Sequence, residues 1–229
     1  MQYKSRPEQI RKAFITSVPV MAGYVILGIG FGILLAEKGY GLPWAFAMSV
    51  FIYAGSLQYA GVSMIDGGVS LITAALTSLM INARHLFYSI SMIDKYKGSG
   101  RYKPYLIFAL TDETYSLLSD GSVPEGCEPA FYRFMVSLFN HCWWISGSVL
   151  GSLMSSSLPF STKGIEFSMT ALFVSAFAEQ WYTSKEHTAA LCGLVCSVIS
   201  LLVFGPADFL IPSMAAIMVC LIILRRRRI

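Results

Sequence analysis

Apolar stretches recur along almost the whole chain, with short polar stretches between them. We place apolar segments at 13–36, 43–65, 68–93, 104–119, 130–157, 165–182, 187–204 and 208–225. A helix needs about 20 mostly apolar residues to cross a bilayer, and most of these segments are close to that length. The pattern therefore predicts an all-α, polytopic bundle of membrane helices, formed as a single transmembrane domain over residues 1–229.

Basic residues lie at the ends of these segments and indicate which loops face the cytoplasm. Residues 1–12, 95–103 and 225–228 each hold four of the 17 lysines and arginines. The positive-inside rule places such clusters on the cytoplasmic side, so we expect both termini and loop 95–103 there. If every segment crossed fully, however, that loop would lie outside.

Segment 43–65 is the best candidate for one that does not cross. The run Ala-Gly-Ser at 54–56 weakens a helix, and polar Gln58 follows it. Non-helical backbone at membrane depth is tolerated where it is buried in protein or lines a cavity. A re-entrant 43–65 puts loop 95–103 inside and the acidic loop 120–129 outside.

A second segment, 165–182, is predicted to behave in the same way, which leaves about six full spans. The stretches 51–59 and 173–181 align without gaps and share a phenylalanine, an alanine, a glutamine and a final aromatic residue. They suggest an inverted repeat of 13–93 and 130–204, with the two copies facing opposite ways. Inverted repeats with broken helices are typical of secondary transporters.

Composition supports a membrane location and gives no sign of catalysis. The chain is 55% hydrophobic and 13% charged, with a mean hydropathy of +0.60, whereas soluble domains carry about 25% charged residues. Its +4 net charge comes from the loop clusters, so we expect a lipid bilayer and no nucleic acid as partner. Five cysteines follow no metal or disulfide spacing, and hydrolase and phosphate-loop motifs are absent. We expect no enzyme activity, no metal and no cofactor.

Charged residues nevertheless lie inside two apolar segments. Arg84 precedes Asp94 by ten residues, so it lies about 15 Å inside its helix end. Asp112 and Glu113 follow Lys103 by nine and ten residues. An antiparallel helix pair would bring the arginine level with both carboxylates, as expected when intramembrane charges pair or face water.

This charge pairing has a structural and a functional interpretation. A buried ion pair can simply fix helix packing, with Asn82 and Thr111 as interhelical hydrogen-bonding groups. Two carboxylates facing one arginine, however, leave one acid to titrate or to meet a substrate ammonium. The sequence leaves open which acid pairs with Arg84, because neighbours on a helix point about 100° apart.

Further polar residues share these segments. His85 and Asn82 lie on one helix face, and His85 can relay protons or pack as a neutral side chain. Ser56 and Gln58 follow the predicted break, where a half-helix start with free N–H groups suits a carboxylate. Alternatively, the small residues there permit close helix packing.

The same packing interpretation applies to two Gly-x-x-x-Gly motifs, Gly28 to Gly32 and Gly147 to Gly151. Small residues at this spacing let two helices approach closely.

The chain resembles a known family. In order along residues 14–220, "WAFAMSVFIYAGSLQYAG", "TSLMINARHLFYSISM", "LTDETY", "WWISGSVLG" and "GPA" are similar to the AzlC-type large subunit of bacterial branched-chain amino acid exporters. The positions that match the family's motifs are Ser56, Gln58, Asn82, Arg84, His85, Thr111, Asp112 and Glu113.

The resemblance implies export of leucine, isoleucine, valine or similar neutral amino acids across the bacterial inner membrane, drawing on the proton gradient. It also implies a second, small membrane subunit of the AzlD type. We expect Ser56, Gln58, Asn82, Arg84, Asp112 and Glu113 to bind substrate. Asp112, Glu113 and His85 are the candidates for proton coupling. A passive channel and a non-transporting assembly subunit are the alternatives.

Overall fold

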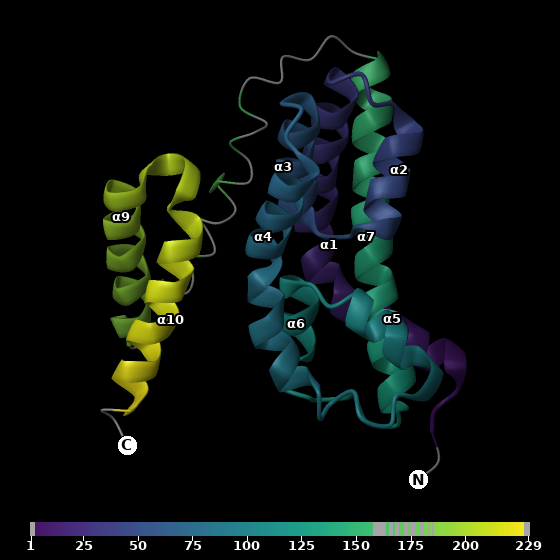
Figure 1. Cartoon of the computed structure of the whole chain (residues 1–229). Coiled ribbons are helices and arrows are strands. Elements are labelled where there is room, and N and C mark those ends of the chain that lie inside the picture. The colour runs from purple at the N-terminus through teal and green to yellow at the C-terminus, as the bar shows by residue number, and fades with distance from the viewer. Residues whose placement is uncertain are drawn as a thin grey trace. The chain divides into compact units, whose positions relative to one another are not determined.

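Every described element of the chain is a helix, as predicted (Figure 1). The computed structural model describes residues 3–157, 164, 167, 170–171, 174, 177–178, 181–182, 184 and 186–226. The chain divides into two compact units, Met1–Met169 and Thr170–Ile229. We describe each unit by itself, and a single domain over residues 1–229 stays a prediction.

Unit 1 is built on the long helices α1 (Arg6–Glu37), α4 (Leu71–Met92) and α7 (Pro129–Ser157). Helices α1 and α7 pack side by side and run in the same direction. Near their starts, the Thr16 hydroxyl lies 2.8 Å from that of Tyr132. Further along, Gly32 lies against Ser148 and Ser152. The apolar segments 13–36 and 130–157 are therefore parallel, so their predicted opposite orientation is wrong.

Both Gly-x-x-x-Gly motifs lie in this helix contact. A Cβ atom added to Gly28 would lie 2.9 Å from the backbone nitrogen of Ser148, and one added to Gly147 would lie 2.6 Å from the carbonyl oxygen of Val25. At Gly32 and Gly151 the facing backbone is closer still. The motifs thus serve close helix packing, which confirms that interpretation.

Segment 43–65 is broken where the sequence predicts it. Helix α2 (Leu42–Phe51) ends, and α3 (Gly55–Asp66) begins after a short non-helical link. Tyr53 in that link has a φ of 43°, a left-handed conformation that is uncommon for bulky side chains. Lys38, before α2, binds Asp66 at the end of α3 with 2.6 Å between Nζ and Oδ2. The two helices therefore form a hairpin that returns to the end where it started.

Segment 104–119 is also broken, although the sequence analysis treats it as one continuous span. A 3₁₀ turn, η1 (Gly100–Tyr102), leads into α5 (Lys103–Phe108), and α6 (Asp112–Leu118) follows a break. Thr111 causes a new helix start, because its Oγ1 accepts a hydrogen bond from the Thr114 backbone N–H, as N-cap residues do. The prediction of a continuous span is wrong.

Helices α5 and α6 form a second hairpin, which brings two loops to one end of unit 1. Lys95 donates to the Ser119 carbonyl oxygen, and Arg133 donates to the Lys95 carbonyl oxygen at 2.6 Å. The N-terminal segment joins them, since Lys12 donates to the Glu125 carbonyl oxygen at 3.0 Å. The acidic loop 120–129 thus lies beside the basic loop, and its predicted place on the opposite side is wrong.

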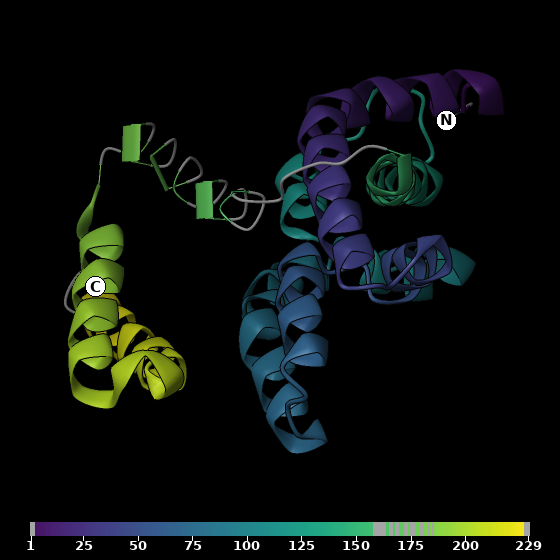
Figure 2. The ribbon, with the colours of Figure 1, turned by 90° about the horizontal axis from the view of Figure 1, so that it is seen from above.

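Unit 2 contains a helical hairpin of α9 (Thr188–Asp208) and α10 (Leu210–Arg226), which lie side by side in Figures 1 and 2. Gly205, with a φ of 74°, kinks the end of α9. The hydroxyls of Ser197 and Ser213 lie 3.0 Å apart across the hairpin and fix its register.

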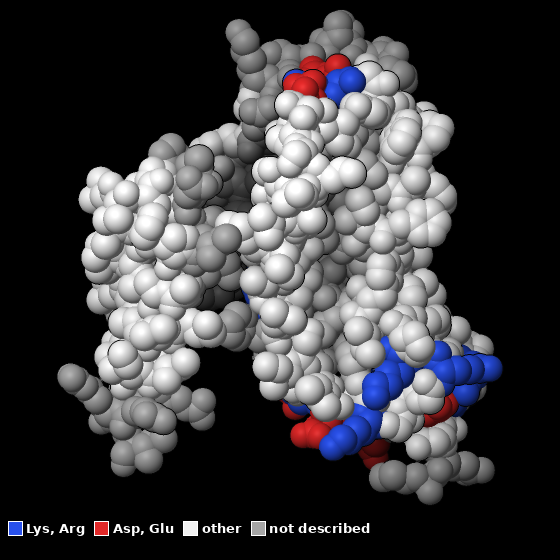
Figure 3. All heavy atoms as spheres, viewed as in Figure 1, with Lys and Arg blue, Asp and Glu red and all other residues white. Residues whose placement is uncertain are grey.

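Two helical stretches in the described part of the chain are long and apolar enough to cross a membrane, Arg6–Glu37 and Thr188–Gly205. On the face of unit 1 shown in Figure 3, charged side chains gather at the two ends, with a largely uncharged stretch between them. The count of six full spans stays a prediction. Segment 165–182, including most of the repeat match at 173–181, lies largely outside the described residues.

Candidate functional site

Arg84 binds two residues that come from the two helix breaks. Its Nη1 lies 2.6 Å from Oδ2 of Asp112, the first residue of α6. Its Nη2 donates to Oγ of Ser56, the second residue of α3, at 2.8 Å. The Arg84 and Asp112 side chains are 36% and 38% exposed. The predicted meeting of the arginine with an acid is confirmed, and the acid that pairs with it is Asp112.

Glu113 belongs to a different hydrogen-bond group. The Tyr24 hydroxyl donates to its Oε2 at 2.7 Å and lies 2.6 Å from Oγ1 of Thr111. Tyr24 is buried and comes from the middle of α1. The two neighbouring acids thus have separate partners, one a guanidinium and the other a neutral hydroxyl.

Hydrogen bonds continue from this group to α7. The Thr111 hydroxyl donates to that of Thr114 at 3.1 Å, and Asn140 Nδ2 donates to the same Thr114 oxygen at 3.0 Å. Thr114 and Asn140 are fully buried. A continuous polar chain therefore runs from Glu113 through α1 and α6 to α7.

Several acceptor oxygens in this region are buried and have no hydrogen-bond partner within the described residues. They are Asn82 Oδ1, Asp112 Oδ1 and Asn140 Oδ1. A buried acceptor without a donor costs free energy, so such atoms call for a ligand or water. An ammonium group would suit these three oxygens, because it supplies only hydrogen-bond donors and they are acceptors.

Gln58 is fully buried, and protein groups use both ends of its amide. Its Oε1 accepts a hydrogen bond from the Trp144 indole N–H at 2.9 Å. Its Nε2 donates to the Ser49 hydroxyl at 3.4 Å. Gly55 lies beneath the same indole, where an added Cβ would lie 2.9 Å from Trp144 Cη2. Gln58 and Trp144 thus hold the start of α3 against α7.

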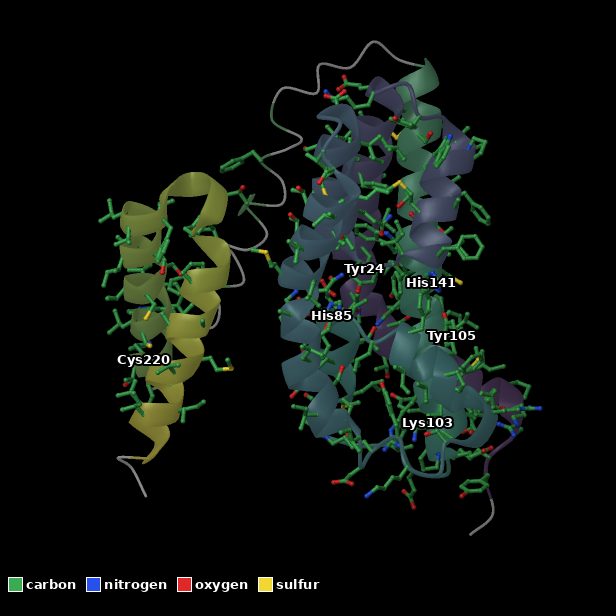
Figure 4. All side chains as sticks on the ribbon, in the orientation of Figure 1. Tyr24, His85, Lys103, Tyr105, His141 and Cys220 are labelled. Atoms are coloured by element: carbon green, nitrogen blue, oxygen red, sulfur yellow. The ribbon has the colours of Figure 1, made fainter. Side chains whose placement is uncertain are left out.

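His141 and Tyr105 complete the polar centre, and sequence reasoning did not select them as site residues. His141 Nδ1 lies 2.9 Å from the Tyr105 hydroxyl, and its Nε2 lies 3.1 Å from the Ser49 carbonyl oxygen. Its ring stacks on Tyr53 with centroids 4.1 Å apart. In Figure 4, Tyr24 and His141 lie at the middle of unit 1. The one sequence signal was a histidine in the middle of an apolar segment.

The other predicted residues lie nearby on α4 without joining these hydrogen bonds. His85 packs against Tyr88, with ring centroids 5.1 Å apart, and has no hydrogen bond within the described residues. Figure 4 places it at the level of Tyr24. Asn82 is half-buried. The structure therefore joins Arg84, Ser56 and Asp112, and leaves Asn82 and His85 beside them.

Comparison with known proteins decides the family. The model of the AzlC protein family matches residues 19–158. The chain is also 42% identical over 94% of its length to a Bacillus subtilis protein, of which it covers 85%. The chain belongs to the AzlC family. That relative is named branched-chain amino acid transport protein AzlC.

Other relatives of this AzlC-family chain are described as membrane proteins. An uncharacterized membrane protein of Haemophilus influenzae is 40% identical over 92% of the chain and 86% of its own length. The inner membrane protein YgaZ of Escherichia coli is 27% identical over 80% of the chain and 78% of its own length. No solved structure matches the chain. The family is thus one of membrane transport components, which points away from an enzyme.

Proposed function

We propose that this chain exports branched-chain or similar neutral amino acids from the cytoplasm, driven by the proton gradient. The observation that carries the proposal is the contact of Arg84 with Ser56 and Asp112. These residues belong to the tips of two hairpins that enter unit 1 from opposite ends. Broken helices that meet between the two membrane faces are typical of substrate sites in secondary transporters.

A zwitterionic amino acid can replace both contacts of the Arg84–Asp112 ion pair with contacts of its own. The substrate carboxylate binds the Arg84 guanidinium, the Ser56 hydroxyl and the N–H groups at the start of α3. Its ammonium binds Asp112, whose Oδ1 is buried without a partner within the described residues. Because the zwitterion replaces each lost ionic contact, neither Arg84 nor Asp112 is left as a lone charge in a low-dielectric site.

Glu113 carries the coupled proton in this proposal, because Arg84 engages its neighbour. A carboxyl that faces the Tyr24 hydroxyl can exist as the acid or the anion without breaking an ion pair. The hydroxyls of Tyr24, Thr111 and Thr114 give a proton a route from Glu113 into the bundle centre, and Asn140 holds the last of them by a hydrogen bond. His85 is a second candidate for this step, and Gln58 positions α3.

The transport cycle is alternating access, in which the hairpins α2–α3 and α5–α6 open the site to one side at a time. The termini are cytoplasmic, and a small AzlD-type subunit is the partner that the family resemblance implies. The proposed mechanism requires no cofactor.

Efflux from cells tests the proposal. Cells fed dipeptides of valine, leucine, isoleucine or methionine should accumulate less free amino acid when they express this chain with its partner. Collapsing the proton gradient should abolish that difference. Efflux that persists after collapse would favour a passive channel instead.

The scaffold alternative needs a separate experiment. Asp112→Asn and Glu113→Gln, made singly, should each lower proton-driven efflux per chain in the membrane. Efflux is divided by membrane abundance, because Asp112→Asn leaves Arg84 without its anion. Asp94→Asn is the matched control, because Asp94 is 83% exposed and pairs only locally with Lys97. Unchanged transport in both site variants would indicate a non-transporting assembly subunit.

A further inference from the structure

Three cysteine thiols come together in the hairpin of unit 2. Cys192 and Cys196 lie on α9, and Cys220, which Figure 4 labels, lies on α10. Their Sγ atoms all lie within 4.8 Å of one another, and each residue is partly exposed. The proposed transport mechanism uses none of them.

The hairpin's geometry explains the cluster. Cys192 and Cys196 are four residues apart, so they lie on one face of α9. The Ser197 and Ser213 hydroxyls, 3.0 Å apart, set the register between the helices. The two helices are antiparallel. The step back from Ser197 to Cys192 on α9 therefore runs in the same direction as the step forward from Ser213 to Cys220 on α10. Cys220 therefore lies on the Cys192 side of the Ser197–Ser213 contact, and its Sγ comes within 4.8 Å of those of both α9 cysteines.

We propose that these thiols bind one soft monovalent metal ion of the Cu(I) type. Thiol sulfur is a soft ligand that selects Cu(I), Zn(II) and iron–sulfur clusters. Structural Zn(II) is almost always bound by four protein ligands. Within the described residues, however, only three His, Cys, Asp or Glu side chains gather here. Three sulfurs suit the lower coordination number of Cu(I).

Charge also favours a monovalent ion. One thiol loses its proton to water as its sulfur bonds to Cu(I), and the other two thiols donate lone pairs as neutral ligands. No electron is transferred. The loaded site is then neutral overall, which keeps the cost of placing it in apolar surroundings low.

The distances permit this coordination after a small closure. An ion at the centre of three sulfurs 4.8 Å apart would lie about 2.8 Å from each, against ~2.3 Å for a metal–thiolate bond. Rotation about the Cys Cα–Cβ bonds supplies such a movement without changing either helix.

Titration of the purified full-length chain with Cu(I) tests the proposal. Under ascorbate, and against a coloured Cu(I) chelator, the chain should bind one Cu(I). Cys192→Ser, Cys196→Ser and Cys220→Ser should each lower the affinity by at least about tenfold. The matched controls Cys127→Ser and Cys142→Ser, which alter thiols of α7 and its preceding loop, should leave it unchanged.

A second measurement needs no variant and so does not depend on their folding. Ag(I), which has no accessible redox change here, should protect Cys192, Cys196 and Cys220 of the unaltered chain from maleimide, as read by peptide mass spectrometry. Cys142, which is exposed, should still react. Equal labelling of the three thiols with and without Ag(I), or a Zn(II) affinity equal to that for Cu(I), would overturn the proposal.

Discussion

Glu113 and Asp112 are adjacent in the chain but differ in what surrounds them. Asp112 binds a guanidinium, whereas Glu113 accepts a hydrogen bond from the Tyr24 hydroxyl. The Asp112 contact needs the charge of both partners, whereas the Glu113 contact is a hydrogen bond from a neutral hydroxyl. In the proposed function, this difference assigns substrate binding to Asp112 and proton coupling to Glu113.

Glu113→Gln should separate coupling from binding. The amide oxygen can still accept from Tyr24 but cannot titrate, so uphill efflux should fall by at least about tenfold. Exchange of labelled for unlabelled leucine across vesicles, which needs no net proton movement, should persist. Loss of exchange together with uphill efflux, at normal abundance, would contradict the assignment.

Arg84 and Asp112 should behave as a coupled pair. Arg84→Met leaves Asp112 without its cation and should lower the membrane abundance of the chain, because a partly buried lone charge is destabilising. Adding Asp112→Asn should restore abundance, since the uncompensated charge is gone, while transport stays absent. Quantitative blots and efflux assays of the single and double variants measure both effects. Equal abundance in all variants would mean that the pair contributes no stability.

At the scale of elements, sequence reasoning predicted one helix break and missed the other. The run Ala54-Gly55-Ser56 predicted the break between α2 and α3, because small residues weaken a helix. The second lay in Thr111-Asp112-Glu113, a cap residue followed by acids, which is a helix-start signal. The sequence analysis interpreted these side chains as site chemistry or as helix-packing groups, and not as a helix start. The contact between Arg84 and Asp112 could be predicted from the depth of each residue along its helix. The contacts of Tyr24, Asn140 and the three thiols depend on which helix faces pack together, and residue spacing does not reveal that.

The contact between α1 and α7 gives a prediction at the same scale. Gly32→Ala places a methyl group into the Ser148 backbone and should destabilise the fold by about 2 kcal/mol. Gly23→Ala is the matched control on the same helix, because an added Cβ there meets nothing within 4 Å. Its effect should stay within about 1 kcal/mol. Thermal unfolding in detergent compares the two, and equal melting temperatures would count against close packing.

At the scale of unit 1, each of two long helices is followed by a hairpin that turns back. Helix α1 precedes α2–α3, and α4 precedes α5–α6. The hairpins enter from opposite ends, and Arg84 of α4 bridges their breaks through Ser56 and Asp112. This pairing of helix and hairpin differs from the predicted repeat of 13–93 and 130–204. It explains why the N-terminal segment and the charged loops 95–103 and 120–129 lie at one end.

Accessibility to a membrane-impermeant thiol reagent tests this arrangement in cells. On a background with the native cysteines replaced, Lys97→Cys and Glu125→Cys, at two exposed positions, should react from the same side of the membrane, because the α5–α6 hairpin returns to the end where it began. Val69→Cys, at an exposed position close to the Lys38–Asp66 pair at the other end, should react from the opposite side. If positions 97 and 125 reacted from opposite sides, segment 104–119 would cross the membrane. Arg84 could then no longer meet Asp112 at the tip of a re-entrant hairpin, and the exchange of partners with a zwitterion would lose its structural basis.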